Sequence, residues 1–330
     1  MRLEVWSADE RALGFYRAEY SHHLQQGEQP YQVVVRLRIN LPEQTARLIF
    51  HTHKLLARWR YSIEFGTDEI NIEARGNYFS IPMIHHMLVH PALRFLASTR
   101  GVLMLHAGGV SRDGKSVLFS GKGGTGKTTT TAILLSDRQT GWQVHADDYV
   151  FLTPQPKSLA YMTRQHIYLP LLKWAPQVGA VMNTWERSGL FVFGHLRRWS
   201  HEGLKWPVRI EPERAWPKND LCFEASPAGL VLLRRDQREK AELRPLADRA
   251  AALDELLEMN FEEGRHFIDL ASAVHPDFDQ RLAAWRHRER ELLAAVIEKV
   301  PLYELVLPYT TQDFRSAQMR ISALLLSIME

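Results

Sequence analysis

The stretch SGKGGTGKTTTT (residues 120–131) contains the pattern G-x-x-x-x-G-K-[ST] between Gly121 and Thr128. Glycines let the backbone turn tightly and approach a ligand without Cβ clashes. In such a loop backbone N–H groups surround phosphates, the lysine reaches the β- and γ-phosphates, and the hydroxyl of Thr128 ligates Mg²⁺. We therefore expect ATP and Mg²⁺ as cofactors, held by Gly121, Lys122, Gly123, Gly124, Thr125, Gly126, Lys127, Thr128 and Thr129.

The segments around this loop predict a strand before it and a helix after it. Apolar runs at 102–110 and 115–121 read as strands, and Asp113-Gly114 between them favours a hairpin, because glycine tolerates the positive φ of a tight turn. Residues 128–137 predict a helix, whose N-terminal N–H groups and dipole favour an anion. The strand that enters the loop should thus pair antiparallel with the strand before it.

Two neighbouring carboxylates, Asp147 and Asp148, follow twenty positions after Lys127 in the strand-like stretch 141–154. One of them can hold the Mg²⁺ that bridges the phosphates, while the other accepts a proton from an attacking hydroxyl. Two close anions also raise the pKa of one of them, which suits a base. The alternative is a solvated Asp-Asp turn, since aspartate is common in turns.

Other polar residues can be read in two ways. His106 lies in the strand-like run before the glycines, and on spacing alone it reads as a satisfied strand histidine. The basic stretch 195–209 could clamp an anionic substrate or the transferring phosphoryl group. Basic surface runs are more often solvated loops. The candidate substrate-binding cations in that stretch are Arg197, Arg198, Lys205 and Arg209.

The rest of the chain predicts two domains. Residues 1–82 contain period-2 strand patterns at 31–41, 47–53, 61–66 and 69–81, typical of a small antiparallel β-rich module. Residues 83–330 contain the loop and an alternation of strands and helices that indicates an α/β core. Further elements expected there are helices at 83–99, which Pro91 can kink, 249–260, 281–300 and 312–329, and strands at 228–235 and 302–307.

The amino-acid composition indicates which classes of protein the chain can belong to. The 330 residues are 45% hydrophobic and 24% charged, which is ordinary for a globular protein. The net charge of +3 is too balanced to predict nucleic-acid binding. A lone cysteine, Cys222, fits a reducing cytoplasm, and we expect neither a signal peptide nor a membrane span.

The stretches LMLHAGGV, DGKSVLFSGKGGTGKTT and VHADDYVFL together resemble the core of HPr kinase/phosphorylase and its kinase-like relatives, whose fold is related to phosphoenolpyruvate carboxykinase. The specific similarity covers roughly residues 102–153 and leaves out the first 82. It implies Asp147 as the general base, Asp148 as a Mg²⁺ ligand beside Thr128, and His106 as an auxiliary to the base. Lys127 completes the expected catalytic set.

The sequence departs from that family after the Asp pair. Residues 158–169 (SLAYMTRQHIYL) lack the Glu-x-Arg-Gly signature of the bifunctional enzymes, which argues against phosphorylase activity and against HPr as the substrate. We expect an ATP-dependent kinase that transfers the γ-phosphate to a hydroxyl of a protein, peptide or small molecule. Arg198, Lys205 and Arg209 are its expected substrate contacts. A homo-oligomer is compatible with the sequence.

The competing class is the deviant Walker A switch ATPase of the partition or division-site type, which acts through a partner protein. It is similar at SGKGGTGKTTT, where Lys122 would be its signature lysine. About 120 residues precede the loop here, Asp113-Gly114 indicates a hairpin, and the next strand ends in Ala-Asp-Asp-Tyr rather than Asp-x-Asp-Pro. These features favour the kinase. The Asp pair also argues against a third class, a nucleotide-binding scaffold that transfers no phosphate.

Overall fold

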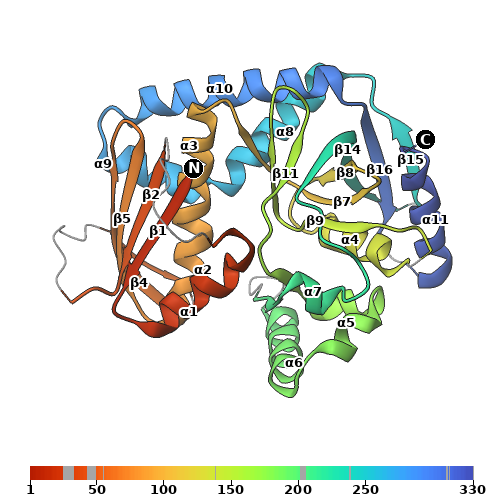
Figure 1. Ribbon diagram of the computed structural model, residues 1–330, viewed down its shortest axis with the longest axis horizontal. Coiled ribbons are helices and arrows are strands. Elements are labelled where there is room, and N and C mark those ends of the chain that lie inside the picture. Colours follow the sequence, from red (N-terminus) through yellow and green to blue (C-terminus); the bar gives the residue numbers. More distant parts are fainter. Residues whose placement is uncertain are drawn as a thin grey trace. The chain divides into compact units, whose positions relative to one another are not determined.

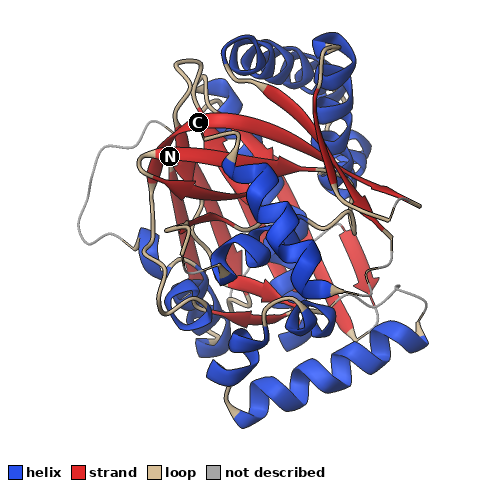
Figure 2. Ribbon diagram, turned by 90° about the vertical axis from the view of Figure 1, so that its right-hand side faces the viewer, coloured by secondary structure: helices blue, strands red, loops and turns tan. Residues whose placement is uncertain are grey.

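The computed structural model describes residues 1–24, 33–42, 50–54, 56–137, 139–200, 206–237, 239–309, 311 and 313–329. The protein is a mixed α/β structure with mixed sheets (Figures 1 and 2). It divides into two compact units: unit 1 comprises Met1–Met104 and Asn260–Leu292, and unit 2 comprises Leu105–Met259 and Leu293–Glu330. Among the described residues, no helix combines the length and apolar character needed to cross a bilayer.

Unit 1 is built on a five-stranded sheet with the order β1-β2-β5-β4-β3. Its strands are β1 (Arg2–Ser7), β2 (Val34–Ile39), β3 (Phe50–Lys54), β4 (Ala57–Phe65) and β5 (Glu69–Gly76). Its helices are α1 (Glu10–Glu19), α2 (Ile81–Ile84), α3 (His90–Thr99) and α9 (Arg265–Val274), and α8 (Arg249–Glu263) and α10 (Phe278–Lys299) each belong partly to it.

The prediction that this module is antiparallel was wrong. β1 pairs parallel with β2, and β2 pairs parallel with β5, whereas β5-β4 and β4-β3 are antiparallel. The period-2 pattern was correct, since Val35, Leu37 and Ile39 are buried while Arg36 and Arg38 are more exposed. Such a pattern shows which face of a strand is buried and does not determine its direction. The helix α1 was not predicted either.

The predicted helix at 83–99 forms with a local irregularity at Pro91. A π-helical stretch (His85–Val89) separates α2 from α3, and the N–H of His90 donates to the carbonyl of His85. Proline lacks the N–H that a regular helix needs, so the wider turn before it absorbs the mismatch. Gly101, with φ +69°, follows the end of this helical segment.

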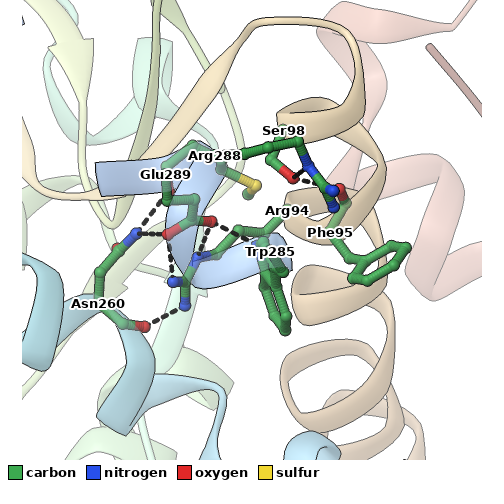
Figure 3. Close-up of polar contacts among 8 residues, drawn as sticks. Arg94, Phe95, Ser98, Asn260, Trp285, Arg288 and Glu289 are labelled. Carbon is green, nitrogen blue, oxygen red and sulfur yellow. Dashed lines mark hydrogen bonds and ion pairs between the residues drawn. The ribbon is translucent and has the colours of Figure 1, made fainter. Parts of the chain in front are cut away.

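A buried polar network links residues 260–292 to α3 within unit 1 (Figure 3). The guanidinium of Arg94 on α3 pairs with the carboxylate of Glu289 on α10 (Nε–Oε1 2.7 Å) and donates to the carbonyl of Asn260. Trp285 Nε1 (2.7 Å) and Asn260 Nδ2 (3.1 Å) donate to the same carboxylate. Both ionised side chains are almost completely buried. The units therefore divide the chain differently from the predicted domains 1–82 and 83–330.

Unit 2 contains most of a nine-stranded sheet with the path β6-β10-β11-β14-β8-β7-β9, to which β16 is added beside β14 and β15 beside β16. The strands are β6 (Leu103–His106), β7 (Gly108–Arg112), β8 (Lys115–Ser120), β9 (Gln143–Ala146), β10 (Tyr149–Leu152), β11 (Ser158–Ala160), β14 (Glu224–Asp236), β15 (Glu242–Pro245) and β16 (Leu302–Pro308). A separate ribbon pairs β12 (Gln165–Ile167) with β13 (Val208–Ile210). The helices are α4 (Lys127–Ser136), α5 (Pro176–Val181), α6 (Thr184–Trp199), α7 (Pro212–Ala215) and α11 (Phe314–Leu326).

Strand directions place several strand ends at one edge of this sheet. β8, β14 and β16 are parallel to one another. β7 is antiparallel to both β8 and β9, so β9 runs in the same direction as β8. The carboxyl ends of β8, β9, β14 and β16 therefore point toward the same edge, which is where ligands bind in open α/β sheets.

Candidate functional site

The predicted hairpin and loop are present. β7 and β8 are joined by Asp113 (φ +51°) and Gly114 (φ +74°), the conformation of a tight two-residue hairpin turn. β8 ends at Ser120, and α4 begins at Lys127. The intervening loop turns through Gly124 (φ +87°) and Gly126 (φ +116°), where a side chain would be strained. Both positions show why this loop needs glycine.

The side chain of Lys127 folds over the loop. Its Nζ donates to the carbonyl of Gly121 at 2.7 Å, and the hydroxyl and N–H of Thr125 bond to the carbonyl of Lys122. Thr128 and Thr129 lie half-buried in the first turn of α4. The ammonium and the first helical turn thus face the same small loop, which is a favourable place for phosphate oxygens.

Arg235 supports this loop from β14 and was not predicted from the sequence. Its Nε donates to the carbonyl of Thr125 at 3.0 Å, and its Nη1 donates to the carbonyl of Pro308 at 2.6 Å. Burial lowers the pKa of this guanidinium. A Cβ on Gly126 would lie 3.1 Å from Arg235 Nη2, so the arginine packs directly against the loop. In the sequence, this role of Arg235 was indicated only by the two arginines at the end of the predicted buried strand 228–235.

The sheet register brings the Asp pair close to the loop. Gly108 on β7 lies opposite Phe119 near the end of β8, and its neighbour Gly109 lies opposite Ala146, the last residue of β9. Asp147 follows Ala146 directly. Adjacent strands are about 4.8 Å apart, so the ends of β8 and β9 are separated by roughly 10 Å. This is the range that a metal–triphosphate group spans.

Asp147 is the more buried member of the pair, with 5% of the residue exposed. Its Oδ2 accepts a hydrogen bond from the backbone N–H of His166 at 2.9 Å. A Cβ on Gly108 would lie 3.1 Å from the carbonyl oxygen of Asp147 and 3.2 Å from the hydroxyl of Thr131 in α4. The backbone of Asp147 and the side chain of Thr131 in α4 therefore both lie close to Gly108, while the Asp147 carboxylate bonds to β12 through His166.

Asp148 contacts the histidine that the sequence singled out. His106 Nε2 lies 3.1 Å from Asp148 Oδ1, and the histidine ring packs against Tyr149 with centroids 5.3 Å apart. The hydroxyl of Ser120 donates to the carbonyl of His106 at 3.1 Å, which ties this histidine to the end of β8. The Asp148 side chain is 22% exposed, against 3% for Asp147. His106 was expected beside the base, and it lies beside Asp148 rather than Asp147.

The β12–β13 ribbon supplies one cation, Arg209, and one histidine, His166, next to the Asp pair. His166 and Arg209 face each other across the ribbon, and Arg209 Nε donates to His166 Nε2 at 3.1 Å. Because arginine can only donate, Nε2 must accept, so the proton of the neutral ring is on Nδ1. That Nδ1 lies 3.8 Å from Asp147 Oδ2.

The charges of both carboxylates also affect the pKa of Tyr168. Burial, followed by the charges of Asp148 and Asp147, raises its pKa to about 12, while Arg197 and Arg209 act in the opposite direction. The guanidinium of Arg197, in the last turn of α6, lies 5.2 Å from the centre of the Tyr168 ring. Sequence reasoning missed His166 and Tyr168, because nothing in SLAYMTRQHIYL marks them as neighbours of the Asp pair.

The predicted substrate cations therefore have different positions. Arg209 donates to His166, whose backbone N–H bonds to Asp147, whereas Arg197 packs on the ring of Tyr168. Arg198 is exposed on the last turn of α6. Lys205 falls in 201–205, outside the described residues. Of the four cations, Arg209 is thus linked to Asp147 through His166.

All of these residues belong to unit 2. A Cβ on Gly123 or Gly124 would meet nothing within 4 Å, so the loop is open to a ligand there, and the hydroxyl of Thr128 and the Asp pair are the hard oxygen donors that Mg²⁺ prefers. The residues present therefore fit ATP and Mg²⁺. The chain matches no known protein-family model, and a search of curated proteins finds no match.

Proposed function

We propose that the protein is an ATP-dependent kinase with a P-loop core like that of the HPr kinase relatives, which transfers the γ-phosphate to a hydroxyl group. The observation that carries this proposal is the register of β8, β7 and β9. It gives the phosphate loop and the Asp pair a common edge, about two strand spacings apart. A loop that only binds nucleotide needs no second carboxylate there.

The geometry favours different chemical roles for the two carboxylates. Asp148 is the more exposed one and is bonded to His106, so we assign it as the general base that accepts the hydroxyl proton. Asp147 is nearly buried, and its backbone lies beside Gly108 close to Thr131 of α4, so we assign its carboxylate with Thr128 to the Mg²⁺. This exchanges the roles that the family resemblance implied and keeps His106 beside the base.

The remaining residues would bind and stabilise charge. Lys127 would leave the carbonyl of Gly121 for the β- and γ-phosphate oxygens, because an ammonium gains more from a phosphate than from a neutral carbonyl. Arg209 and Arg197 would stabilise charge on the transferred group. Bound Mg²⁺ would neutralise developing phosphate charge. The bond from phosphorus to the β,γ-bridging oxygen breaks, the bond to the acceptor oxygen forms, and the acceptor proton passes to Asp148.

The roles can be separated with γ-labelled ATP, a desalted cell extract as the source of acceptor, and a Mg²⁺ titration. We expect Asp148→Asn to lower label transfer at least about 100-fold at every Mg²⁺ concentration, because the base is lost. Asp147→Asn should raise the Mg²⁺ concentration needed for half-maximal transfer. Asp113→Asn, in the exposed hairpin turn, is the matched control and should transfer label normally.

Three results would contradict the proposal. If Asp148→Asn and Asp147→Asn both transfer label as the wild type does, the Asp pair takes no part in the reaction. Label recovered only as free phosphate would favour a switch ATPase. A shifted Mg²⁺ requirement in Asp148→Asn, with none in Asp147→Asn, would restore the original assignment of roles.

A further inference from the structure

The open face of the unit 1 sheet carries charges in two different arrangements. Toward one end of the strands, arginines have acidic partners: Arg36 pairs with Glu4 (3.2 Å) and with Glu69, and Arg38 pairs with Glu73 (3.1 Å). Such alternation of sign is the usual way in which a sheet face is kept soluble and stable. These paired arginines can be compared with the arginines at the other end of the same face.

At the other end, the arginines have no such acidic partners among the residues that the structure describes. Arg60 on β4 lies directly opposite Arg75 on β5 and directly opposite His51 on β3. Arg58, two residues before Arg60, is on the same face of β4. All four side chains are exposed, and none makes an ion pair with a residue in the described ranges. Like charges directly opposite in a sheet are destabilising, so this row has an energetic cost in the absence of an anion.

These residues surround a hollow of about 600 Å³, lined by Asn40, His51, Arg58, Trp59, Arg60, Arg75, Gly76 and Asn77. No acidic residue is among them. The volume is in the range of small-molecule sites, roughly 300–1,000 Å³. It is larger than a lone phosphate needs.

The floor of the hollow is built from specific contacts. Asn40 has φ +54°, unusual for a residue other than glycine, and its Oδ1 accepts from the N–H of Gly76 at 2.8 Å. A Cβ on Gly76 would lie 2.8 Å from the carbonyl of Arg58 and 2.8 Å from Trp59 Cβ, so this close approach requires glycine. Strained backbone of this kind is concentrated at functional sites.

Trp59, which also lines the hollow, is 1% exposed, and because side chains alternate along a strand its indole lies on the opposite face of β4 from Arg58 and Arg60. Asp9 accepts from Asn40 at 3.4 Å and is itself paired with Arg11 at 3.0 Å. Glu73, two residues before Arg75 on the same face of β5, is paired with Arg38.

We propose that this hollow, which we call the arginine hollow, binds a phosphorylated small molecule. Arginine is suited to phosphate because its guanidinium donates two parallel hydrogen bonds. Three arginines in one hollow match a ligand with about three negative charges. A nucleic acid would need a longer basic track, whereas the neighbouring arginines of this face are neutralised by glutamates. The inference does not depend on the function of unit 2.

Thermal unfolding of the full chain, with and without inorganic pyrophosphate as the probe, tests this proposal. Without anion and at low salt, Arg75→Gln should raise the melting temperature, because it removes the repulsion with Arg60. Pyrophosphate should raise the melting temperature of the wild type and of Lys127→Ala, in which the phosphate loop is impaired. Arg60→Gln and Arg75→Gln should each weaken pyrophosphate binding about tenfold. Arg17→Gln, an exposed arginine on α1, is the matched control and should behave as the wild type.

The proposal is overturned if pyrophosphate stabilises the Arg60→Gln and Arg75→Gln variants as much as the wild type. It is also overturned if stabilisation disappears in Lys127→Ala, which would place all binding at the loop, or if the wild type shows none. A lower melting temperature of Arg75→Gln without anion would show that the row carries no repulsion. That result would remove the physical basis of the inference.

Discussion

The buried carboxylate of Glu289 offers a sharp test of how unit 1 is held together (Figure 3). The change Glu289→Gln keeps the shape of the side chain and removes its charge. It leaves the guanidinium of Arg94, only 3% exposed, as an uncompensated buried cation. Breaking a buried ion pair from one side in this way costs about 3–5 kcal/mol.

That magnitude follows from the contacts. Arg94 donates two hydrogen bonds to the carboxylate, and Trp285 and Asn260 donate one each. Each bond to a charged group contributes about 1.5–3 kcal/mol, and the sum is offset by a desolvation cost of several kcal/mol per ion. The intact network therefore adds little net stability, but loss of one charge leaves the desolvation cost of the other.

Urea unfolding followed by tryptophan fluorescence measures the effect as a change in the free energy of unfolding. Glu291→Gln, an exposed position two residues later on α10, is the matched control and should change it by less than about 0.5 kcal/mol. The double variant Arg94→Met/Glu289→Gln should lose less than the sum of the two single variants, because no charge is then left buried. A loss below about 1 kcal/mol in Glu289→Gln, or strict additivity in the double variant, would refute this reasoning.

Three further predictions concern unit 2. Gly126→Ala should destabilise the chain by about 1–2 kcal/mol in thermal unfolding, because alanine is strained at φ +116° and would press on Arg235, whereas Gly123→Ala, with open space around it, should be close to neutral. Arg235→Lys should weaken ATP binding in calorimetry about tenfold, since an ammonium cannot bridge the carbonyls of Thr125 and Pro308; unchanged affinity would separate this arginine from the loop. Tyr168, with its pKa raised to about 12, binds its proton more tightly in the folded state, so stability should fall by about 1.4 kcal/mol per pH unit between pH 10 and 12. Tyr168→Phe should lose that part of the slope, and an equal slope in both proteins would contradict the assignment.

The loop and its flanking elements could be predicted because their signals are local. Asp113-Gly114 requires a particular turn, and the loop glycines require particular φ values, so the hairpin, the loop and α4 followed from a few residues. Their order along the chain also predicted that the Asp pair would follow a strand. The split of the predicted strand 141–154 into β9 and β10 occurs at that pair.

The features that could not be predicted depend on contacts between distant segments. The parallel pairing of β1 and β2 is set by how the whole sheet assembles, and no residue pattern within a strand encodes it. Glu289 lies in a helix rich in charged residues, and only the fold shows that Arg94, nearly two hundred positions away, neutralises it. The contact of His166 with Asp147 likewise depends on the pairing of two three-residue strands, which are too short to carry a period.

Cleavage of the backbone by bound Fe²⁺ would test most directly whether the loop and the Asp pair form one site. With ATP present, Fe²⁺ in place of Mg²⁺, supplied with hydrogen peroxide and ascorbate, generates hydroxyl radicals at the metal and cuts the chain near its ligands. We expect two ATP-dependent cuts, one near Thr128 and one near Asp147, and loss of the second in Asp147→Asn. A cut near Thr128 alone, or an unchanged pattern in the variant, would contradict the claim that these carboxylates act on the nucleotide held by the loop.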